Sequence, residues 1–352
     1  MAGPMTGFLD LLLKDEALEA LIGTEADITA MISVELALAK ATCACSLIGE
    51  DTAKAIATAG HGFKPDLAKL NGATLKDGVV VPELVRQLQA SVGAPHDVSV
   101  HFGATSQDII DTALAVELIA VFELFDGRLQ ALLKSLDHLA ATAGDNPLMG
   151  RTRMQAAIPI KVSDRLAVWR GLVERVHVAL GEVRSHNLIV SLAGPAGTSE
   201  KFGGRIGDVR HAMAALLHLG VPDYVPHAAR DRIAALGNWL SQVTGALGKI
   251  GQDIALMAQN EIAEIALSGT GGSSAMAHKQ NPVRAEVLVA LARYNAVQVS
   301  GLHQSLVHEQ ERSGAAWTLE WMILPGMLNA TGTALIHAEA LLGSVRRMGS
   351  AG

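Results

Sequence analysis

Aromatic side chains are scarce in this chain. Phe, Trp and Tyr make up 3% of its 352 residues, although 49% of the residues are hydrophobic. Aliphatic side chains, with Ala and Leu dominant, therefore fill most apolar positions. This composition is typical of closely packed long helices, in which small side chains let the backbones approach one another. So much apolar content with few loops also indicates that part of it is buried between subunits.

Blocks of like charge are lacking as well. The chain has 28 basic and 35 acidic residues, a net charge of −7, spread without a run of one sign. This argues against nucleic acid or an anionic membrane surface as a partner. No uncharged apolar run reaches the length of a membrane span. The first residues have no basic region and soon reach Asp10, so we expect no signal peptide.

Cysteine is nearly absent, with only Cys43 and Cys45 in the chain. On the predicted helix they point to different faces and cannot bond to each other without disrupting it. No second cysteine pair or suitable histidine cluster accompanies them, so we expect no metal site and no cofactor. The interpretation is structural thiols in a reducing cytoplasm.

A long apolar seam indicates the fold. Within residues 107–142 apolar side chains recur at steps of four and three, which predicts one helix of about 54 Å. The seam consists of Ile110, Leu114, Leu118, Val121, Phe125, Leu129, Leu132, Leu136 and Leu139.

The remaining pattern extends this picture. Strands are hardly suggested anywhere, and we predict an all-α, elongated long-helix bundle whose exposed seams need partners. We expect an N-terminal helical domain over 1–105 and a central bundle over 106–352 that forms the oligomerisation core. Further helices are predicted at 25–60, 161–187, 236–257, 283–310 and about 317–345, with a short one near 82–92 and loops at 143–160, 193–204 and 268–281.

The most informative segment is the loop within residues 269–286. Three glycines give its backbone freedom, and Ser273 and Ser274 follow them directly. Lys279 then supplies a cation, and Asn281 before a proline predicts an N-cap, so that a helix begins there. The start of a helix directs free N–H groups and partial positive charge toward the serines. Such an arrangement suits a carboxylate, or a carbanion whose charge spreads onto one.

This loop resembles the signature Gly-Ser-Ser-x-Met-Pro-x-Lys-x-Asn-Pro of the fumarase/aspartase superfamily. Ten of the eleven places match, and Ala277 replaces the usual proline, which loosens the loop. The resemblance implies chemistry on a C–O or C–N bond beside a carboxylate. It implies catalytic roles for Ser273, as the proton carrier, with Ser274 and Lys279, and substrate binding by Met276 and Asn281.

A second polar segment, from His101 to Asp108, precedes the predicted long helix. Thr105 or Ser106 can cap that helix, and the same hydroxyls and N–H groups make an anion site. The segment resembles the superfamily's Gly-x-Thr-Ser-x-Asp region, which implies that Thr105, Ser106 and Gln107 bind a substrate carboxylate. His101 matches a histidine that contacts substrate in several lyases, and a structural role for it is equally compatible with the sequence.

A third segment, Gly150-Arg-Thr-Arg-Met-Gln155, resembles the superfamily's Gly-Arg-Thr-His-x-Gln. The resemblance implies substrate binding by Arg151, Thr152, Arg153 and Gln155. Arg153 stands where many lyases place a histidine acid; it stays protonated but can clamp a carboxylate through two hydrogen bonds. The substitution favours a substrate rich in carboxylates. For Arg151 a structural ion pair is the alternative.

A fourth segment begins at His308 and includes Arg312, Trp317 and Trp321. It looks like the Glu-x-Glu-Arg…Ala-Trp-x-x-Glu-Trp stretch of bacterial 3-carboxy-cis,cis-muconate cycloisomerases, and implies that Arg312 is a carboxylate ligand. The loop that ends at Thr198 also resembles that family, and Thr198 is assigned to the substrate site. Similarity covers residues 25–325 at intervals.

The resemblance implies that the chain closes a tricarboxylate diene to a lactone through an aci-carboxylate, without metal or redox cofactor. It implies a homotetramer in which conserved regions from three subunits meet at one site. Superfamily members commonly carry a further small helical domain, which we expect to be largely absent here. The alternatives are an adenylosuccinate lyase-like C–N lyase and a non-catalytic structural oligomer of the same fold.

Overall fold

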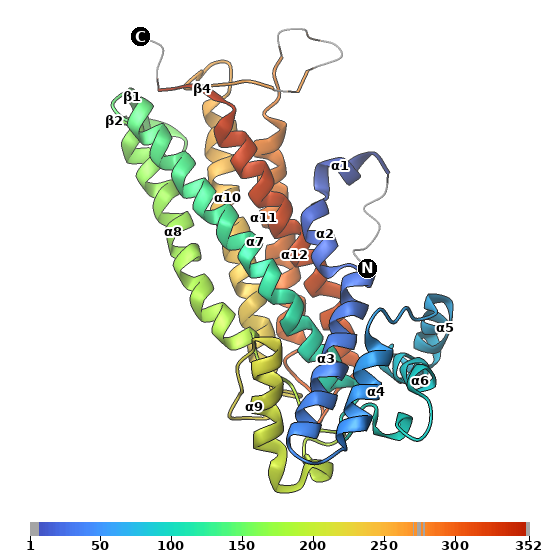
Figure 1. Ribbon diagram of the computed structural model, residues 1–352. Coiled ribbons are helices and arrows are strands. Elements are labelled where there is room, and N and C mark those ends of the chain that lie inside the picture. The colour runs from blue at the N-terminus through green and yellow to red at the C-terminus, as the bar shows by residue number, and fades with distance from the viewer. Residues whose placement is uncertain (1–6, 270, 273–275, 277–278, 350–352) are drawn as a thin grey trace.

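The computed structural model describes residues 7–269, 271–272, 276 and 279–349. Long helices dominate it, and five of them run side by side in an elongated bundle (Figure 1). The elements, in chain order, are η1 (Gly7–Leu9), α1 (Asp10–Leu13), α2 (Glu16–Ile22), α3 (Thr24–Ala44), α4 (Glu50–Gly60), α5 (Leu67–Asp77), α6 (Val81–Val92), η2 (Asp97–Ser99), α7 (Ser106–Ala143), β1 (Pro147–Thr152), β2 (Gln155–Lys161), α8 (Val162–Asn187), η3 (Glu200–Arg205), α9 (Ile206–Leu217), α10 (Asp231–Met257), β3 (Ile265–Leu267), α11 (Val283–Gln304), α12 (Gly314–Gly343) and β4 (Val345–Met348).

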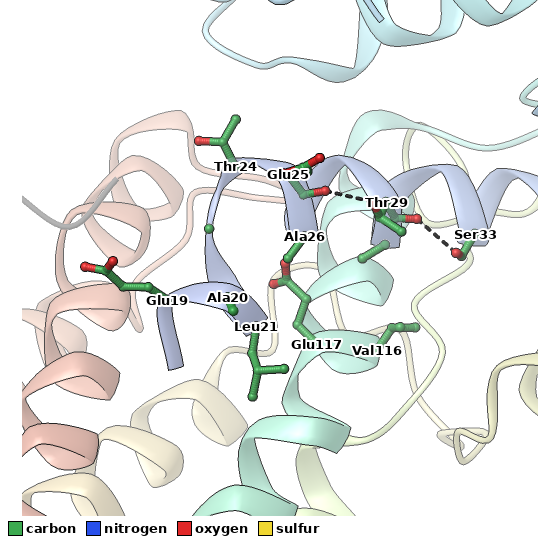
Figure 2. A pocket seen from close by; sticks show the side chains of 12 residues that line it. Glu19, Ala20, Leu21, Thr24, Glu25, Ala26, Thr29, Ser33, Val116 and Glu117 are labelled. Carbon is green, nitrogen blue, oxygen red and sulfur yellow. Dashed lines mark hydrogen bonds between the residues drawn. The ribbon is translucent and has the colours of Figure 1, made fainter. Parts of the chain in front are cut away.

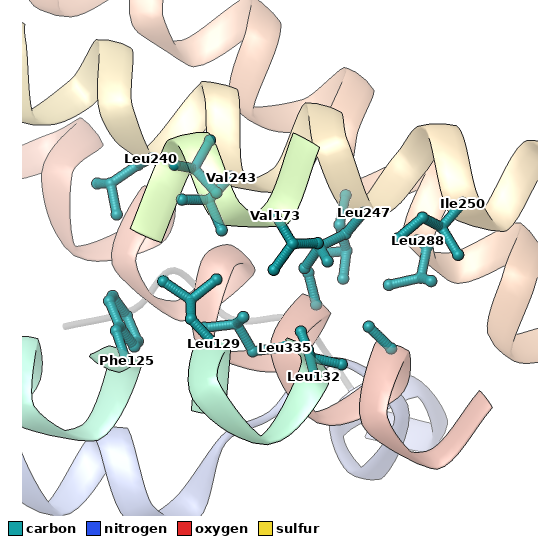
Figure 3. Packing of buried hydrophobic residues seen from close by; sticks show 14 of the residues in the cluster. Phe125, Leu129, Leu132, Val173, Leu240, Val243, Leu247, Ile250, Leu288 and Leu335 are labelled. Atoms are coloured by element: carbon teal, nitrogen blue, oxygen red, sulfur yellow. The ribbon is translucent and has the colours of Figure 1, made fainter. Parts of the chain in front are cut away.

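The main core lies between α7, α8, α10, α11 and α12. Figure 3 shows side chains from these helices meeting along the bundle axis, among them Leu129, Val173, Leu247, Leu288 and Leu335, and all five are buried. The seam predicted on residues 107–142 supplies one wall of this core, because its apolar positions face a single side of α7.

A second apolar cluster fills the space between α3, α4, α6, the first turns of α7, and α9. Residues before 105 contribute most of it, but Val190, Leu192, Phe202 and Val209 from later in the chain complete it. The domain boundary predicted between residues 105 and 106 stays a prediction.

Most predicted helices are confirmed. The 107–142 helix is α7, the 161–187 helix is α8, and the seams at 236–257 and 317–345 are α10 and α12. One boundary is wrong, because α11 ends at Gln304 rather than at 310. None of the helices that the model describes is both long enough and apolar enough to cross a bilayer.

The prediction of one continuous helix over 25–60 is wrong. α3 ends at Ala44, and α4 begins six residues later, at Glu50. Ser46 has a φ of 60°, which turns the chain between them. The break lets α4 fold back onto α3, so that both helices bury apolar side chains in the second cluster.

The all-α fold is confirmed, but the loop predicted over 143–160 contains an antiparallel hairpin of β1 and β2, so the loop assignment was wrong here. The signal was missing because every position of β2 except Ile160 is exposed, which leaves no alternation of apolar and polar residues. β3 and β4 form a second two-stranded pair beside the signature loop.

Candidate active site

The predicted site residues fall into two groups at opposite ends of α7 (Figure 1). One group surrounds the first turn of α7, and the other lies on the β1–β2 hairpin and the loop before α11. α7 has 38 residues, so the two groups are separated by about 57 Å within one chain. One molecule of a small carboxylate cannot contact both groups of the same chain.

At its first turn, α7 is capped as predicted. Thr105 is the N-cap of a capping box, and its backbone N–H donates to Asp108 Oδ2 at 2.9 Å. Asp108 also accepts from the backbone N–H groups of Ala193 and Gly194, at 2.8 and 3.0 Å. The carboxylate therefore ties the loop that leads to Thr198 to the start of the helix. Thr198 itself is exposed on that loop.

Arg312 reaches the same place from the segment after α11. Its Nε donates to Gln107 Oε1 at 2.6 Å, and its Nη2 donates to the carbonyl of Pro195 at 3.3 Å. Gln107 is fully buried, and its amide nitrogen donates to the carbonyl of His227 at 2.8 Å. Gln107 thus orients Arg312, while Nη1 of the guanidinium has no hydrogen-bond partner among the residues that the model describes.

Behind Gln107 lies a buried ion-pair network that the sequence analysis missed. Arg230 Nη1 is 2.6 Å from Asp111 Oδ2, and Arg230 Nη2 is 2.6 Å from Glu320 Oε2. Burial by itself would lower the pKa of Arg230 and raise that of Asp111, but their mutual attraction outweighs burial and shifts both in the opposite directions. The sequence did carry a signal for this network: His227, Arg230 and Arg232 lie close together where a loop leads into a helix.

His101 lies in the turn before α7, with a φ of 62°. Its Nδ1 is 2.6 Å from Oε1 of Glu35, a buried residue of α3. His101 therefore has a structural contact, because one edge of its imidazole ring is held by a buried side chain. A substrate role for His101 stays a prediction.

At the other end of α7, Arg151 makes the structural ion pair that was the alternative for it. Its Nη1 is 2.6 and 2.7 Å from the two oxygens of Glu264, which is 4% exposed. This pair joins β1 to the segment before β3. A substrate role for Arg151 stays a prediction.

Arg153 occupies the turn of the hairpin. Thr152 pairs with Gln155, so Arg153 and Met154 are the two central residues of a two-residue turn, with φ of 50° and 67°. Turns of this kind favour Asn and Gly, because both residues need a left-handed backbone. Arg153 is exposed and has no ion-pair partner in the described part of the chain. It lines a cavity of about 640 Å³ with Arg151, Arg165, Lys249 and Glu264.

The signature loop lies at this same end, between β3 and α11. Ser273, Ser274 and Ala277 lie outside the described residues. Gly271 and Asn281 exchange backbone hydrogen bonds of 2.9 and 2.8 Å, which closes the loop, and Met276 and Lys279 are exposed on it. The predicted N-cap is wrong, since α11 begins at Val283 and the Asn281 amide instead faces the carbonyl of Gly272 at 3.5 Å.

Another hollow holds none of these residues. Figure 2 shows it beside α2 and α3, lined by Glu19, Glu25, Thr29, Ser33 and Glu117, with a volume of about 710 Å³. Its polar groups are acidic or hydroxylic, so it offers no cation to a carboxylate substrate. The arginine-bearing ends of α7 are therefore the better candidates for the active site.

Known proteins are similar to most of this chain. A family model described as lyase matches residues 15–301. A 3-carboxy-cis,cis-muconate cycloisomerase of Acinetobacter baylyi is 35% identical over 87% of this chain and 69% of its own. A nitrosuccinate lyase of Streptomyces davaonensis is 32% identical over 96% of this chain and 74% of its own.

Among solved structures, the 3-carboxy-cis,cis-muconate lactonizing enzyme of Pseudomonas putida has a TM-score of 0.91 and 31% identity, over 97% of this chain and 77% of its own. The fold and these similarities lead to one conclusion: the chain belongs to the lyase family of the fumarase/aspartase superfamily.

Proposed function

We propose that this protein closes 3-carboxy-cis,cis-muconate to carboxymuconolactone, a step in the breakdown of aromatic compounds. The observation that carries the proposal is Arg153, exposed and unpaired among the described residues, where many lyases have a histidine. A permanent cation at this place suits a substrate with several carboxylates and does not suit proton transfer. The similarity to cycloisomerases over most of the chain supports the same reaction.

The reaction is an isomerisation, so atoms and electrons balance without a second substrate. An oxygen of one substrate carboxylate bonds to a carbon of the conjugated diene, and the π electrons of that double bond move toward another carboxylate. The aci-carboxylate so formed then takes up a proton at the carbon beside it. Because the nucleophile belongs to the substrate, holding the diene in a curled pose supplies much of the rate.

The predicted residues divide this work. Arg153 and Arg312 bind carboxylates, and Thr105, Ser106 and Thr198 add hydroxyl and N–H donors. Lys279 and Asn281 donate to the aci-carboxylate, where each well-placed donor is worth about 3–4 kcal/mol. Ser273, beside Ser274, is the proposed proton carrier, and replacing it by alanine should lower turnover by more than tenfold.

The proposed active unit is a homotetramer in the cytoplasm. About 57 Å separates the two groups of site residues along α7, so different subunits must supply them. Exposed apolar side chains on the long helices, such as Val178, Val297 and Met322, offer surface for this assembly. The two free cysteines fit a reducing compartment.

Absorbance tests the reaction directly. Purified protein is mixed with 3-carboxy-cis,cis-muconate and, separately, with adenylosuccinate and nitrosuccinate. We expect only the muconate spectrum to change, because the conjugated diene is lost. A change with adenylosuccinate or nitrosuccinate alone would favour a C–N lyase, and no change with any of them would favour the structural oligomer. EDTA should leave the rate unaltered.

A further inference from the structure

Glu35 is a buried carboxylate without an assigned role. It lies in the middle of α3 with 2% of its surface exposed. One oxygen, Oε1, is 2.6 Å from Nδ1 of His101, and the other, Oε2, is buried with no hydrogen-bond partner among the described residues. Leaving half of a buried carboxylate unsatisfied is costly. An imidazolium at His101 would compensate for it.

The contact also directs the other edge of the ring. The two nitrogens of an imidazole lie on different edges, so with Nδ1 held by α3 the Nε2–H points away from that helix. Nε2 has no hydrogen-bond partner within the part of the chain described, and the side chain is 19% exposed. The carbonyl of His101 accepts from Ala104 N–H at 3.3 Å, in the turn that leads to Thr105. His101 is therefore part of the turn that leads into the proposed anion site at the start of α7.

The charges around His101 favour its protonated form. Glu35 faces it from α3, Asp108 from the first turn of α7, and Lys201 from η3. Burial and Lys201 act to lower the pKa of His101, but the carboxylates of Glu35 and Asp108 outweigh them and raise it above 6.5.

We propose that Glu35 is a positioning residue that holds His101 as an imidazolium with its Nε2–H directed at the substrate. His101 then adds a cation to those of Arg153, Arg312 and Lys279. The added positive charge favours a substrate with more carboxylates, so the pair contributes to selection of a tricarboxylate over a dicarboxylate. The identity of this ligand rests on the proposed function, whereas the protonation of His101 does not.

Proton NMR of protein labelled with [13Cε1]histidine tests the protonation without any turnover. The His101 signal is assigned by its loss in His101→Asn and followed from pH 5 to 9 in wild type and Glu35→Gln. We expect a wild-type midpoint above 6.5, lowered by about one unit or more in Glu35→Gln. Asp126→Asn is the matched control, because Asp126 makes a 2.7 Å contact with His177 on the outer side of the bundle. It should leave the His101 midpoint unchanged.

Kinetics test the role in binding. In Glu35→Gln we expect KM for 3-carboxymuconate to rise about tenfold with kcat within about threefold, because a ground-state contact is weakened. The basic limb of kcat/KM should move to lower pH by the same amount as the NMR midpoint. Glu35→Asp, which keeps the charge, should restore part of both changes.

Two results would overturn the inference: a wild-type His101 midpoint below its ordinary value, or a Glu35→Gln protein whose KM and pH profile match wild type. The first needs only His101→Asn, for assignment of the signal, so it decides the matter even if Glu35→Gln does not fold. Failure of the wild-type protein to convert 3-carboxymuconate would reject the proposed function. The NMR midpoint would still show whether Glu35 holds His101 in its protonated form.

Discussion

At the residue scale, the β1–β2 turn combines backbone strain with a proposed substrate ligand. Arg153 and Met154 both hold a left-handed backbone that favours glycine or asparagine. Such strain costs about 1–3 kcal/mol per residue and collects at functional sites. Met154 is 72% exposed, so packing does not explain the side chains at this turn. The proposed role of Arg153, presentation of its guanidinium to a substrate, would explain the arginine.

We therefore expect substitution of Arg153 to weaken substrate binding without lowering the stability of the protein. Arg153→Gly should raise KM for 3-carboxymuconate at least tenfold, because a charged hydrogen-bonded contact is worth about 1.5–3 kcal/mol. The melting temperature should not fall, because glycine accepts the backbone conformation. Met154→Gly is the control: it relieves the same strain and should leave KM unchanged. A KM for Arg153→Gly equal to that of wild type would remove Arg153 from the substrate site.

A second residue-scale prediction concerns Glu117 on α7. Its Oε1 is buried without a hydrogen-bond partner among the described residues, and burial together with Asp27 raises its pKa to about 8. Its folded pKa lies above the unfolded value of 4.5, so the folded state holds the proton more tightly. The stabilisation is complete below pH 4.5 and is lost as the pH rises toward 8.

Glu117→Gln keeps the neutral form at every pH. We expect its melting temperature to match wild type near pH 5 and to exceed it at pH 8.5, by the equivalent of about 2 kcal/mol. Glu123→Gln, at an exposed position of the same helix, should show no such dependence. If the melting temperatures of Glu117→Gln and wild type differed by the same amount at both pH values, the raised pKa of Glu117 would be refuted. Calorimetry at the two pH values makes the measurement.

At the element scale, close approach of α10 and α11 depends on glycine. A Cβ added at Gly251 would lie 2.6 Å from the carbonyl oxygen of Ala285, and one at Gly248 would lie 2.5 Å from Ala292 Cβ. At Gly245, on the same helix, a Cβ would meet nothing within 4 Å. Only one face of α10 therefore requires glycine, and that face holds α11, which carries the signature loop at its start.

Gly251→Ala should lower the free energy of unfolding by about 1–3 kcal/mol, because the added methyl group overpacks the interface against backbone. Gly245→Ala should be neutral or stabilising by up to about 1 kcal/mol, since alanine favours the helix. Urea titration of both variants measures the difference. Similar urea midpoints for the two variants would mean that α11 can move to make room for the methyl group without loss of stability.

At the scale of the whole molecule, the proposed site requires assembly of subunits. The segment before α12, which carries Arg312, and the β1–β2 hairpin, which carries Arg153, lie at opposite ends of the bundle (Figure 1). The proposed reaction needs both arginines. A symmetric oligomer with antiparallel neighbours can bring the start of one α7 to the hairpin of another.

Subunit mixing tests this arrangement. At substrate concentrations below KM, Arg312→Ala and Arg153→Ala should each retain no more than about a tenth of wild-type activity. After dissociation and joint reassembly, about a quarter of wild-type activity should return. Arg312→Ala mixed with Ser106→Ala, which alters the same end, should recover none. Absence of recovery in the first mixture, with reassembly shown by light scattering, would contradict the shared site.

Sequence periodicity by itself determined the long helices, because each buries one continuous apolar stripe and that stripe is visible at steps of three and four. Capping at Thr105 was equally local. The β1–β2 hairpin escaped detection because its exposed strands carry no apolar alternation. The break after Ala44 was missed although Gly49, the N-cap of α4, marked it in the sequence. Asn281 was misassigned as a cap because its backbone pairs with Gly271 across the loop.

Tertiary structure decided which polar residues meet. The chemistry of Arg151, Gln107 and Glu35 could not be read from spacing, because their partners lie 113, 205 and 66 positions away. Local sequence reports propensity and apolar period, which act over a few residues. Ion pairs depend instead on helix packing that brings distant positions within about 4 Å, and only the folded bundle sets that distance.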